Sequence, residues 1–254
     1  MNEVTVRRPG PGSWLTLIGC EAKMVVRDTA GLVVPIGLPL LILVMNAAAA
    51  GDQEVAEGRS ALEVFVLPLV FTIVLATIGI VNMPSFLAYY RRSGVLRRLA
   101  VTPASPAMVL VAQLVVSLAQ VLVGIGLAYA VAVVGFGARP PADVGMALAV
   151  VGLSVAAMYG LGLIVASVAP TPNSAVAIGL IAFFALGAVG GLFGGTASLP
   201  EPVARAASWL PFGATVEALS SAWAGASVDA SNLAGLAITA VVGATVAALL
   251  FRWN

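Results

Sequence analysis

Residues 64–88 have the sequence VFVLPLVFTIVLATIGIVNMPSFLA, which contains no Asp, Glu, Lys or Arg. An α-helix rises 1.5 Å per residue, so about 20 apolar residues cross the roughly 30 Å hydrocarbon core of a bilayer. A helix of this length and composition is therefore predicted to span a membrane.

The same pattern recurs along the chain. Five more stretches without a charged side chain lie at about residues 30–50, 107–136, 144–169, 174–193 and 233–251. Of the 254 residues, 61% are apolar and 9% are charged, against roughly 25% charged in an ordinary soluble domain, so too few polar residues remain to cover a water-soluble globule. We predict an all-α integral membrane protein with six transmembrane helices, in which residues 1–254 form a single transmembrane domain.

The composition also excludes several kinds of chemistry. The chain has no His, one cysteine (Cys20) and one lysine (Lys23), which excludes His-based acid–base catalysis, Cys/His zinc sites and internal disulfides. A nucleotide-binding Walker loop needs a Gly-Lys-Ser/Thr triplet, whereas Lys23 is followed by Met24. The net charge of +1 gives no basic surface for nucleic acid. We expect a chain that is not an enzyme, without catalytic residues, metal or cofactor, and without a nucleic-acid partner.

The basic residues indicate the orientation, because Lys and Arg near span ends stay on the cytoplasmic side. Three basic residues fall on one side of the predicted spans: Arg59, Arg139 and Arg205. Nine fall on the other side: Arg7, Arg8, Lys23, Arg27, Arg91, Arg92, Arg97, Arg98 and Arg252. Both termini are therefore predicted to be cytoplasmic. The N-terminal segment lacks the pattern of a signal peptide, so the first span is expected to stay in the mature protein.

Residues 13–29 precede the first span and are predicted to form an amphipathic helix in the inner membrane interface, in contact with lipid. The polar face would carry Thr16, Lys23 and Arg27. The apolar face would carry Trp14, Leu17, Ile18, Ala22, Val25 and Val26. The alternative is a simple extension of the first span.

Residues 89–106 are predicted to form a cytoplasmic loop. The loop contains four arginines and no acidic residue, and Leu96 and Leu99 are spaced to form the apolar side of a short helix that Pro103 and Pro106 would end. Such an element either binds anionic lipid or fits a groove on a cytoplasmic partner and transmits that partner's motion. The simplest alternative is that its arginines only fix the topology.

The same loop resembles a known family. Residues 91–103, RRSGVLRRLAVTP, resemble the segment after the second span in ABC-2 type permeases, the membrane subunits of ATP-driven exporters such as the daunorubicin-resistance drug exporters. Arg27-Asp28 before a first span with two prolines is similar to the start of that family, and residues 199–225, with the motifs LP, WLPF, VEAL and WAG, are similar to its outer segment. The chain departs from the family where Tyr89-Tyr90 replaces a common glutamate and where Ser220-Ser221 replaces a frequent arginine.

The resemblance implies a half-transporter in a bacterial plasma membrane. This chain and a second copy, or a paralogous permease, would form the pathway, and a separate ABC ATPase subunit that binds ATP and Mg²⁺ would dock under each. The substrate moved outward would be lipophilic or amphipathic: a drug-like compound, a lipid or a lipid-linked glycan. The docking residues would be Tyr90, Arg91, Arg92, Gly94, Arg97, Arg98 and Leu99.

Polar and small residues in the spans are candidates for the pathway or the subunit interface. Gln113 and Gln120 lie seven residues apart on one helix face, and with Asn46 they would bond a neighbouring helix or line a polar cavity. A row of glycines, one every four residues, would let the end of the fifth span approach another helix closely: Gly187, Gly191 and Gly195. The alternative for both groups is packing within the chain.

Residues 196–232 are too polar to cross the membrane. Apolar residues at helical spacing on both sides of Pro211 predict an outer hairpin of two short re-entrant helices, which enter the outer leaflet and return. Trp209, Phe212 and Glu217 are the candidates for an outer gate, and Glu217 either faces water at the exit or only solvates its helix.

The alternative function is that of a secondary transporter or channel without an ATPase. Proton-coupled carriers place a titratable side chain within a span, and the predicted spans contain no Asp, Glu or His. No inverted repeat is evident. An intramembrane enzyme would need clustered carboxylates, His, or a nucleophile with its base. The residues therefore favour a transport subunit whose energy comes from a partner.

Overall fold

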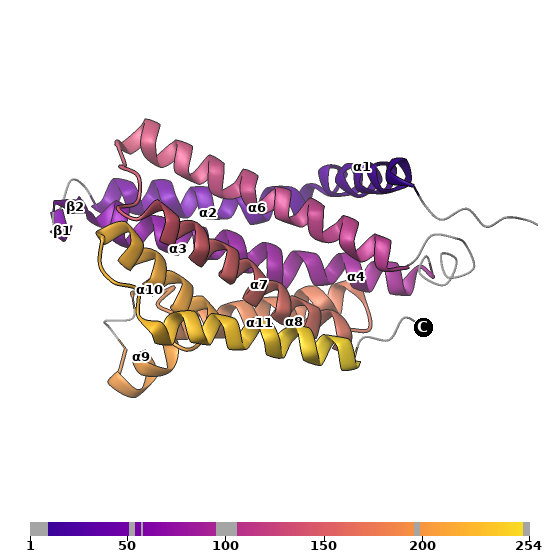
Figure 1. Ribbon diagram of the computed structural model, residues 1–254. Helices are drawn as coiled ribbons and strands as arrows, with labels where there is room; N and C mark the ends of the chain where they lie inside the picture. The colour runs from indigo at the N-terminus through magenta and orange to yellow at the C-terminus, as the bar shows by residue number, and fades with distance from the viewer. Residues whose placement is uncertain (1–9, 51–53, 57, 95–105, 196–198, 251–254) are drawn as a thin grey trace, which may run out of the picture.

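The computed structural model describes residues 10–50, 54–56, 58–94, 106–195 and 199–250. Six helices in these ranges are long and apolar enough to cross a membrane, which confirms the predicted all-α membrane fold. They lie roughly alongside one another (Figure 1). Five of them are single helices: α2 (Thr29–Ala50), α6 (Pro106–Phe136), α7 (Val144–Val168), α8 (Pro172–Val189) and α11 (Ala230–Leu250).

The remaining span is a continuous run of four helical elements, two of them π-helical. These are η1 (Leu62–Val66), α3 (Leu67–Ala76), η2 (Thr77–Asn82) and α4 (Met83–Arg92). The run begins two residues before the predicted stretch, so Glu63 lies within it. It also continues past Ala88, so residues 89–92, which we expected in the loop, form the last helical turn of α4.

The bundle has two ends that differ in what they contain (Figure 1). The α4 end holds α1 (Pro11–Arg27), the last turn of α4 and the connection between α7 and α8. The hairpin end holds the antiparallel pair β1 (Glu54–Ala56) and β2 (Arg59–Ser60), together with the connection between α6 and α7. We use these two names below.

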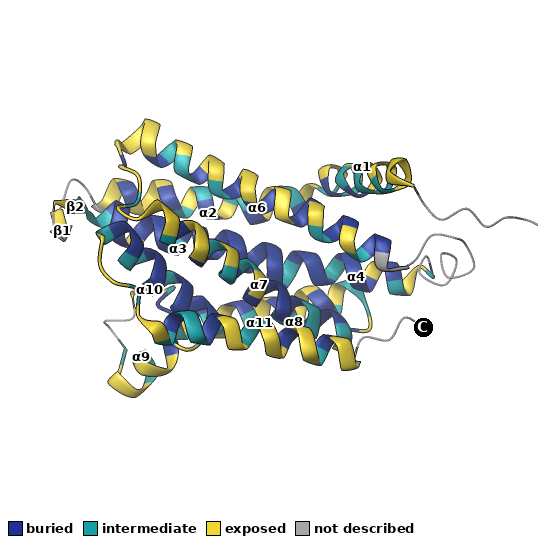
Figure 2. Cartoon of the chain, in the orientation of Figure 1, coloured by how far each residue is buried: buried dark blue, intermediate teal, exposed yellow. Residues whose placement is uncertain are grey.

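The second span lies at the centre of the bundle. Within its most apolar 18-residue window, 83% of the residues are buried inside the chain, against 22% for α2 and 22% for α8 (Figure 2). Glycines permit close contact with this central span: a Cβ on Gly162 of α7 would overlap the carbonyl oxygen of Gly79, and a Cβ on Gly179 of α8 would lie 2.5 Å from the carbonyl oxygen of Ile80. The faces of α2 and α8 remain largely uncovered.

The predicted row of glycines at the end of the fifth span is wrong as a helix face. Helix α8 ends at Val189, and Gly191 and Gly195 adopt φ of +89° and +77° in the turns that follow. A Cβ on Gly187 would meet the side chain of Leu192, also in those turns, at 2.8 Å. Left-handed backbone conformations break the four-residue periodicity, because successive residues no longer lie on one helix face.

Two short helices follow α8, as predicted for the outer segment. These are α9 (Glu201–Ala207) and α10 (Pro211–Ala224). Helix α10 is packed inside the bundle against η1, α3, α7 and α11, and residues such as Phe212, Thr215 and Leu219 are fully buried. The end of α10 meets the connection between α6 and α7, where the Asp143 amide donates to the carbonyl oxygen of Ala222 at 3.1 Å. Entry of these helices into a lipid leaflet stays a prediction.

Candidate functional sites at the two ends of the bundle

Helix α1 packs mainly against α6 through a face centred on Glu21 and Val25, each 3% exposed. Trp14 and Ile18 are half-buried, whereas Val26 is 65% exposed. Contact of the predicted apolar face with lipid stays a prediction. A carboxylate occupies the middle of the face that packs against the bundle, and the rest of the chain supplies a hydrogen-bond donor to it.

The donor is Tyr90 in the last turn of α4. Its hydroxyl donates to Glu21 Oε2 at 2.5 Å and lies 3.4 Å from Met24 Sδ. Burial raises the pKa of Glu21 above its usual value, and the hydrogen bond from Tyr90 partly offsets that rise. Tyr90 itself is only 7% exposed. This candidate docking residue is therefore held inside the chain, whereas its neighbour Tyr89 is exposed.

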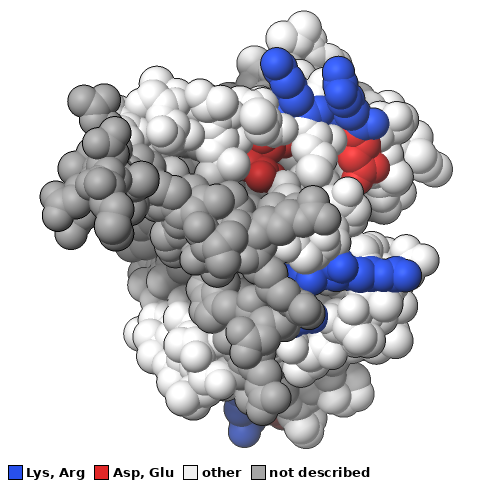
Figure 3. Space-filling view, turned by 90° about the vertical axis from the view of Figure 1, so that its right-hand side faces the viewer, with Lys and Arg blue, Asp and Glu red and all other residues white. Residues whose placement is uncertain are grey.

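The next residues connect α4 to another part of the bundle. The guanidinium of Arg91 donates to the carbonyl oxygen of Ala169, which lies in the connection between α7 and α8. Arg92 is exposed, and Gly94 adopts φ of +70° just after the helix ends. Viewed from this end of the molecule, several Lys and Arg side chains lie on the surface (Figure 3). Three candidate docking residues lie outside the described residues: Arg97, Arg98 and Leu99.

Amide side chains join three spans near the start of α2. Asn82 Nδ2 donates to the carbonyl oxygen of Gly31 at 2.9 Å and to Gln120 Oε1 at 3.2 Å, and Gln120 Nε2 donates to the same carbonyl at 2.7 Å. This geometry agrees with the packing interpretation of Gln120. Gln113 is 2% exposed, and its Oε1 has no hydrogen-bond partner among the described residues. Asn46 is exposed and donates to a carbonyl one turn earlier in its own helix.

Glu63 forms a second polar centre at the hairpin end. Its backbone amide donates to Ser60 Oγ, and the amide of Ser60 donates to Glu63 Oε2, both at 3.3 Å. These two bonds form a reciprocal capping box at the start of the second span. The Ser-x-x-Glu spacing of residues 60–63 is the sequence signal for this arrangement, and our sequence reasoning missed it.

Arg139, in the connection between α6 and α7, pairs with the same carboxylate. Its backbone amide donates to Glu63 Oε1 at 2.7 Å, its Nε donates to that oxygen at 3.1 Å, and its Nη2 donates to Glu63 Oε2 at 3.3 Å. Nη2 also donates to the carbonyl oxygen of Gly58. The hydrogen bond to Glu63 raises the pKa of Arg139 above its usual value. The pair fastens the start of the second span to the end of α6, across 76 residues of sequence.

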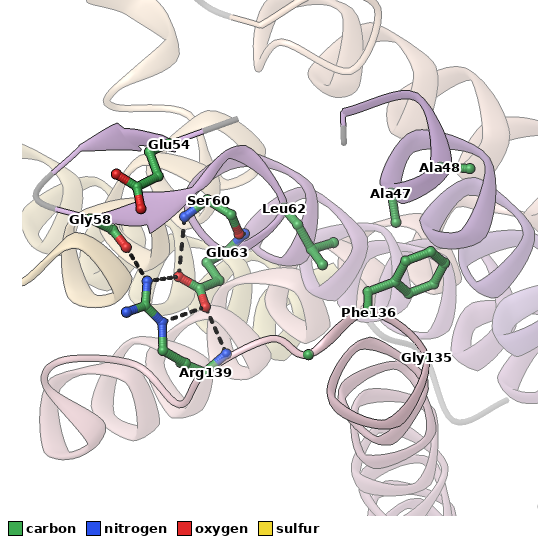
Figure 4. Close-up of a pocket in the computed structure, with 11 residues that line it drawn as sticks. Ala47, Ala48, Glu54, Gly58, Ser60, Leu62, Glu63, Gly135, Phe136 and Arg139 are labelled. Atoms are coloured by element: carbon green, nitrogen blue, oxygen red, sulfur yellow. Dashed lines mark hydrogen bonds and ion pairs between the residues drawn. The ribbon is translucent and has the colours of Figure 1, made fainter. Parts of the chain in front are cut away.

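A cavity of about 530 Å³ lies beside this ion pair. The cavity has an apolar side and a charged side (Figure 4). The Phe136 ring lies beside Ala47 and Ala48 on the apolar side, and Glu54 and Arg139 lie on the opposite, charged side. The cavity is thus bounded by the ends of α2 and α6 and by the hairpin. Its volume falls within the range of about 300–1,000 Å³ that is usual for small-molecule sites. Nothing in the sequence pattern pointed to it.

The three candidates for an outer gate have different environments. Phe212 is fully buried and packs edge-on against Phe183 of α8, with ring centroids 6.0 Å apart. Trp209 is 49% exposed. Glu217 is half-buried. When the side-chain amide of Asn232 is oriented so that both its oxygen and its nitrogen are satisfied, the nitrogen donates to Glu217 Oε2 at 3.3 Å. Phe212 therefore belongs to the core of the bundle, and a gating role for the other two stays a prediction.

The six long helices and the polar contacts at both ends define a polytopic, all-α membrane protein. The sequence model of the ABC-2 type transporter family matches residues 13–224 of this chain, and the chain belongs to that family. It is accordingly a membrane-spanning, non-catalytic permease component of an ABC transporter. Comparison with curated proteins gives no match.

Proposed function

We propose that the chain is the permease subunit of an ATP-driven exporter in a bacterial plasma membrane. It moves a lipophilic or amphipathic compound outward, with ATP and Mg²⁺ bound by a separate ABC ATPase subunit. The observation that carries this proposal is the double attachment of the last turn of α4. Tyr90 joins that turn to α1, and Arg91 joins it to the connection between α7 and α8.

This attachment gives a route for coupling. The chain continues from α4 into residues 95–105, which include Arg97 and Arg98 of the family-like segment. A displacement applied there by an ATPase moves the end of α4, and with it both α1 and the start of α8. Shifts of packed helices of this kind are an ordinary means of switching between two states. The α4 end is accordingly the cytoplasmic end in this proposal, in agreement with its excess of basic residues.

A second permease subunit completes the pathway. Helices α2 and α8 are the spans least buried within the chain, at 22% each. Each exposes large apolar side chains, for example Leu41 and Met45 on α2 and Ile181 and Phe184 on α8. In the proposed complex these faces meet the partner permease, and lipid covers what remains.

The experiment is co-purification and reconstituted transport with a candidate ABC ATPase subunit from the same organism. The Arg97→Glu/Arg98→Glu double variant reverses two charges of the proposed docking loop and is expected to reduce ATP-driven transport and ATPase recovery at least tenfold, with unchanged membrane insertion. The matched control is Arg205→Glu on α9, whose side chain is 74% exposed and which lies at the other end of the bundle from the last turn of α4 (Figure 1). Full transport by the double variant would contradict the docking proposal. An ATPase-free oligomer that conducts ions would replace it with the channel alternative.

A further inference from the structure

The second span changes its backbone hydrogen-bonding register twice, and each change comes just before a proline. The π-helical stretch η1 ends two residues before Pro68, and η2 ends two residues before Pro84. A proline within an α-helix clashes with the carbonyl group four residues earlier and removes its usual backbone donor, and a wider π-helical turn relieves that conflict. We call residues 62–68 the η1 break and residues 77–84 the η2 break. Breaks of this kind are the positions at which long helices bend.

The η1 break is fastened by another helix. The carbonyl group whose usual donor is missing because of Pro68 is that of Val64, and Ser220 Oγ of α10 donates to its oxygen at 2.6 Å. Glu63, one residue earlier, pairs with Arg139 at 3.1 Å. A change of angle at this break would withdraw a hydroxyl from a buried carbonyl group and disturb a buried ion pair, and both changes cost free energy.

The η2 break has a different neighbour at the corresponding position. The carbonyl group whose usual donor is missing because of Pro84 is that of Ile80, and a Cβ on Gly179 of α8 would lie 2.5 Å from its oxygen. A glycine has no side chain that could donate a hydrogen bond, and its Cα–H is at most a weak donor. The hydroxyl groups of Thr77 and Ser85 each donate at 2.7 Å to a carbonyl oxygen three or four residues earlier in the same span. These bonds move with the span, so they do not fix its angle to the neighbouring helices.

The side-chain hydrogen bond from the η2 break to α2 is replaceable. The carbonyl oxygen of Gly31 accepts from Asn82 Nδ2 at 2.9 Å and from Gln120 Nε2 at 2.7 Å. When Asn82 moves away, Gln120 still satisfies that oxygen, and no charged group loses a partner. At Gly162 and Gly179, α7 and α8 approach the break without a side chain. A tilt at this break is therefore less costly than a tilt at the η1 break.

We propose that the η2 break is a hinge at which α4 tilts relative to α3, whereas the η1 break is fixed. Helix α4 has 10 residues and forms a lever of about 15 Å, so a tilt of about 8° moves its end by about 2 Å. Shifts of about this size between packed helices switch other proteins between two states. The inference rests on the proposed function only for the cause of the tilt, because the end of α4 carries Tyr90 and Arg91. The hinge itself is a property of the permease alone.

The experiment is hydrogen–deuterium exchange of the purified full-length permease in nanodiscs, without an ATPase. Backbone amides exchange through local opening, so we expect residues 77–88 of the unmodified chain to exchange about tenfold faster than residues 60–72. Pro84→Ala returns a backbone N–H to the carbonyl oxygen of Ile80 and is expected to slow exchange of residues 77–88 about fivefold. Pro68→Ala is the matched control, because the carbonyl group that its N–H would serve already has a donor from α10. It is expected to change exchange of either segment less than about twofold.

A further variant tests the contrast from the opposite side. Ser220→Ala removes the donor to the carbonyl oxygen of Val64 and is expected to speed exchange of residues 60–72 about fivefold, with residues 77–88 unchanged. Equal exchange of the two segments in the unmodified chain, or unchanged exchange of residues 77–88 in Pro84→Ala, would overturn the inference. If Pro84→Ala does not fold, Ser220→Ala decides: faster exchange confined to residues 60–72 supports the fixed η1 break, and unchanged exchange there contradicts it.

Reconstitution with an ATPase separates the hinge from the proposed function. Pro84→Ala is expected to reduce ATP-driven transport about tenfold with unchanged recovery of the ATPase, because the docking loop is intact and only the tilt is opposed. Pro68→Ala is expected to transport normally. Full transport by Pro84→Ala would overturn the hinge and leave the exporter standing. Fast exchange of residues 77–88 in a chain that no ATPase drives would uphold the hinge and refute the exporter.

Discussion

Glu63 at the hairpin end and Glu21 at the α4 end are both buried carboxylates, with 2% and 3% of their surface exposed, yet their partners differ. Glu63 accepts three hydrogen bonds from Arg139 and one from Ser60. Glu21 is held by the neutral hydroxyl of Tyr90. A glutamate buried to the same extent thus forms an ion pair at the hairpin end and a hydrogen bond with a neutral group at the α4 end.

The difference in partners determines which end can rearrange at the lower cost in free energy. Removing a carboxylate from water costs several kcal/mol, and only well-placed opposite charge and donors compensate that cost. The Glu63 site meets this condition through Arg139 at 3.1 Å and Arg59 at 3.8 Å, so moving it away from both guanidiniums would strand a buried charge. The Glu21 contact can be released by moving one hydroxyl group, and a protonated Glu21 needs no counter-charge. The hairpin end is therefore the fixed end of the bundle, and the contact at the α4 end is the releasable one.

The largest expected effect comes from breaking the ion pair. Arg139→Ala removes the closest counter-charge of the buried Glu63 and both side-chain hydrogen bonds from Arg139. Glu63 then keeps the backbone amide of residue 139 and the more distant guanidinium of Arg59, at 3.8 Å. We expect the apparent melting temperature in detergent, followed by intrinsic fluorescence, to fall by roughly 5–10 °C. Arg205→Ala is the control, since its pair with Glu201 is exposed on both sides and such pairs contribute about 0–1 kcal/mol. Equal shifts for the two variants would show that the hairpin end is not locked by Glu63.

The spans were predictable because the bilayer imposes a strong physical rule on sequence. A helix in lipid must satisfy the hydrogen bonds of its own backbone and present about 20 apolar residues to the bilayer. A stretch of that length without charged residues is therefore enough to identify it. Glu63 was left out of the predicted second span because it is charged, although the observed span begins at Leu62 and includes it. Arg59 pairs with it from four residues away at 3.8 Å, but its closest counter-charge, Arg139, lies 76 residues away, and hydropathy contains no information on such a pairing.

Helix faces and close contacts were harder to predict than spans. The apolar face of α1 was assigned by hydrophobicity, so Glu21 was not recognised as part of the face that packs against the bundle. Its hydrogen-bond donor, Tyr90, lies 69 residues away in the sequence. The glycine row after residue 187 followed a helical period that the chain abandons at Val189. The tight contact of α7 with α11 instead uses Gly160 and Gly243, where a Cβ on Gly243 would lie 2.5 Å from Gly160 Cα. Such pairings depend on which helices become neighbours.

A smaller effect is expected at the other carboxylate. Tyr90→Phe removes the hydroxyl that donates to Glu21 and leaves the aromatic packing unchanged, so the loss is that of one hydrogen bond to a buried group, about 1–2 kcal/mol. This corresponds to a fall of roughly 2–5 °C in the apparent melting temperature. Tyr89→Phe is the matched control, because Tyr89 is 50% exposed. The Glu21→Leu/Tyr90→Phe double variant is expected to recover most of the loss; a double variant as unstable as the sum of the two single ones would contradict direct coupling.

The smallest effect is a dependence of stability on pH above pH 4.5, which arises from the carboxylate at the α4 end. Burial raises the pKa of Glu21 above its usual value of 4.5 in the folded protein. Between 4.5 and the raised value, the folded chain binds a proton that the unfolded chain has released, so the free energy of unfolding falls as the pH rises through this window and is constant above it. We expect Glu21→Gln to remove a decline of about 1–2 °C in apparent melting temperature between pH 4.5 and pH 7, and Glu201→Gln to preserve it. An unchanged pH profile in Glu21→Gln would mean that the carboxylate at the α4 end is already compensated as fully as Glu63, and the contrast between the two ends would disappear.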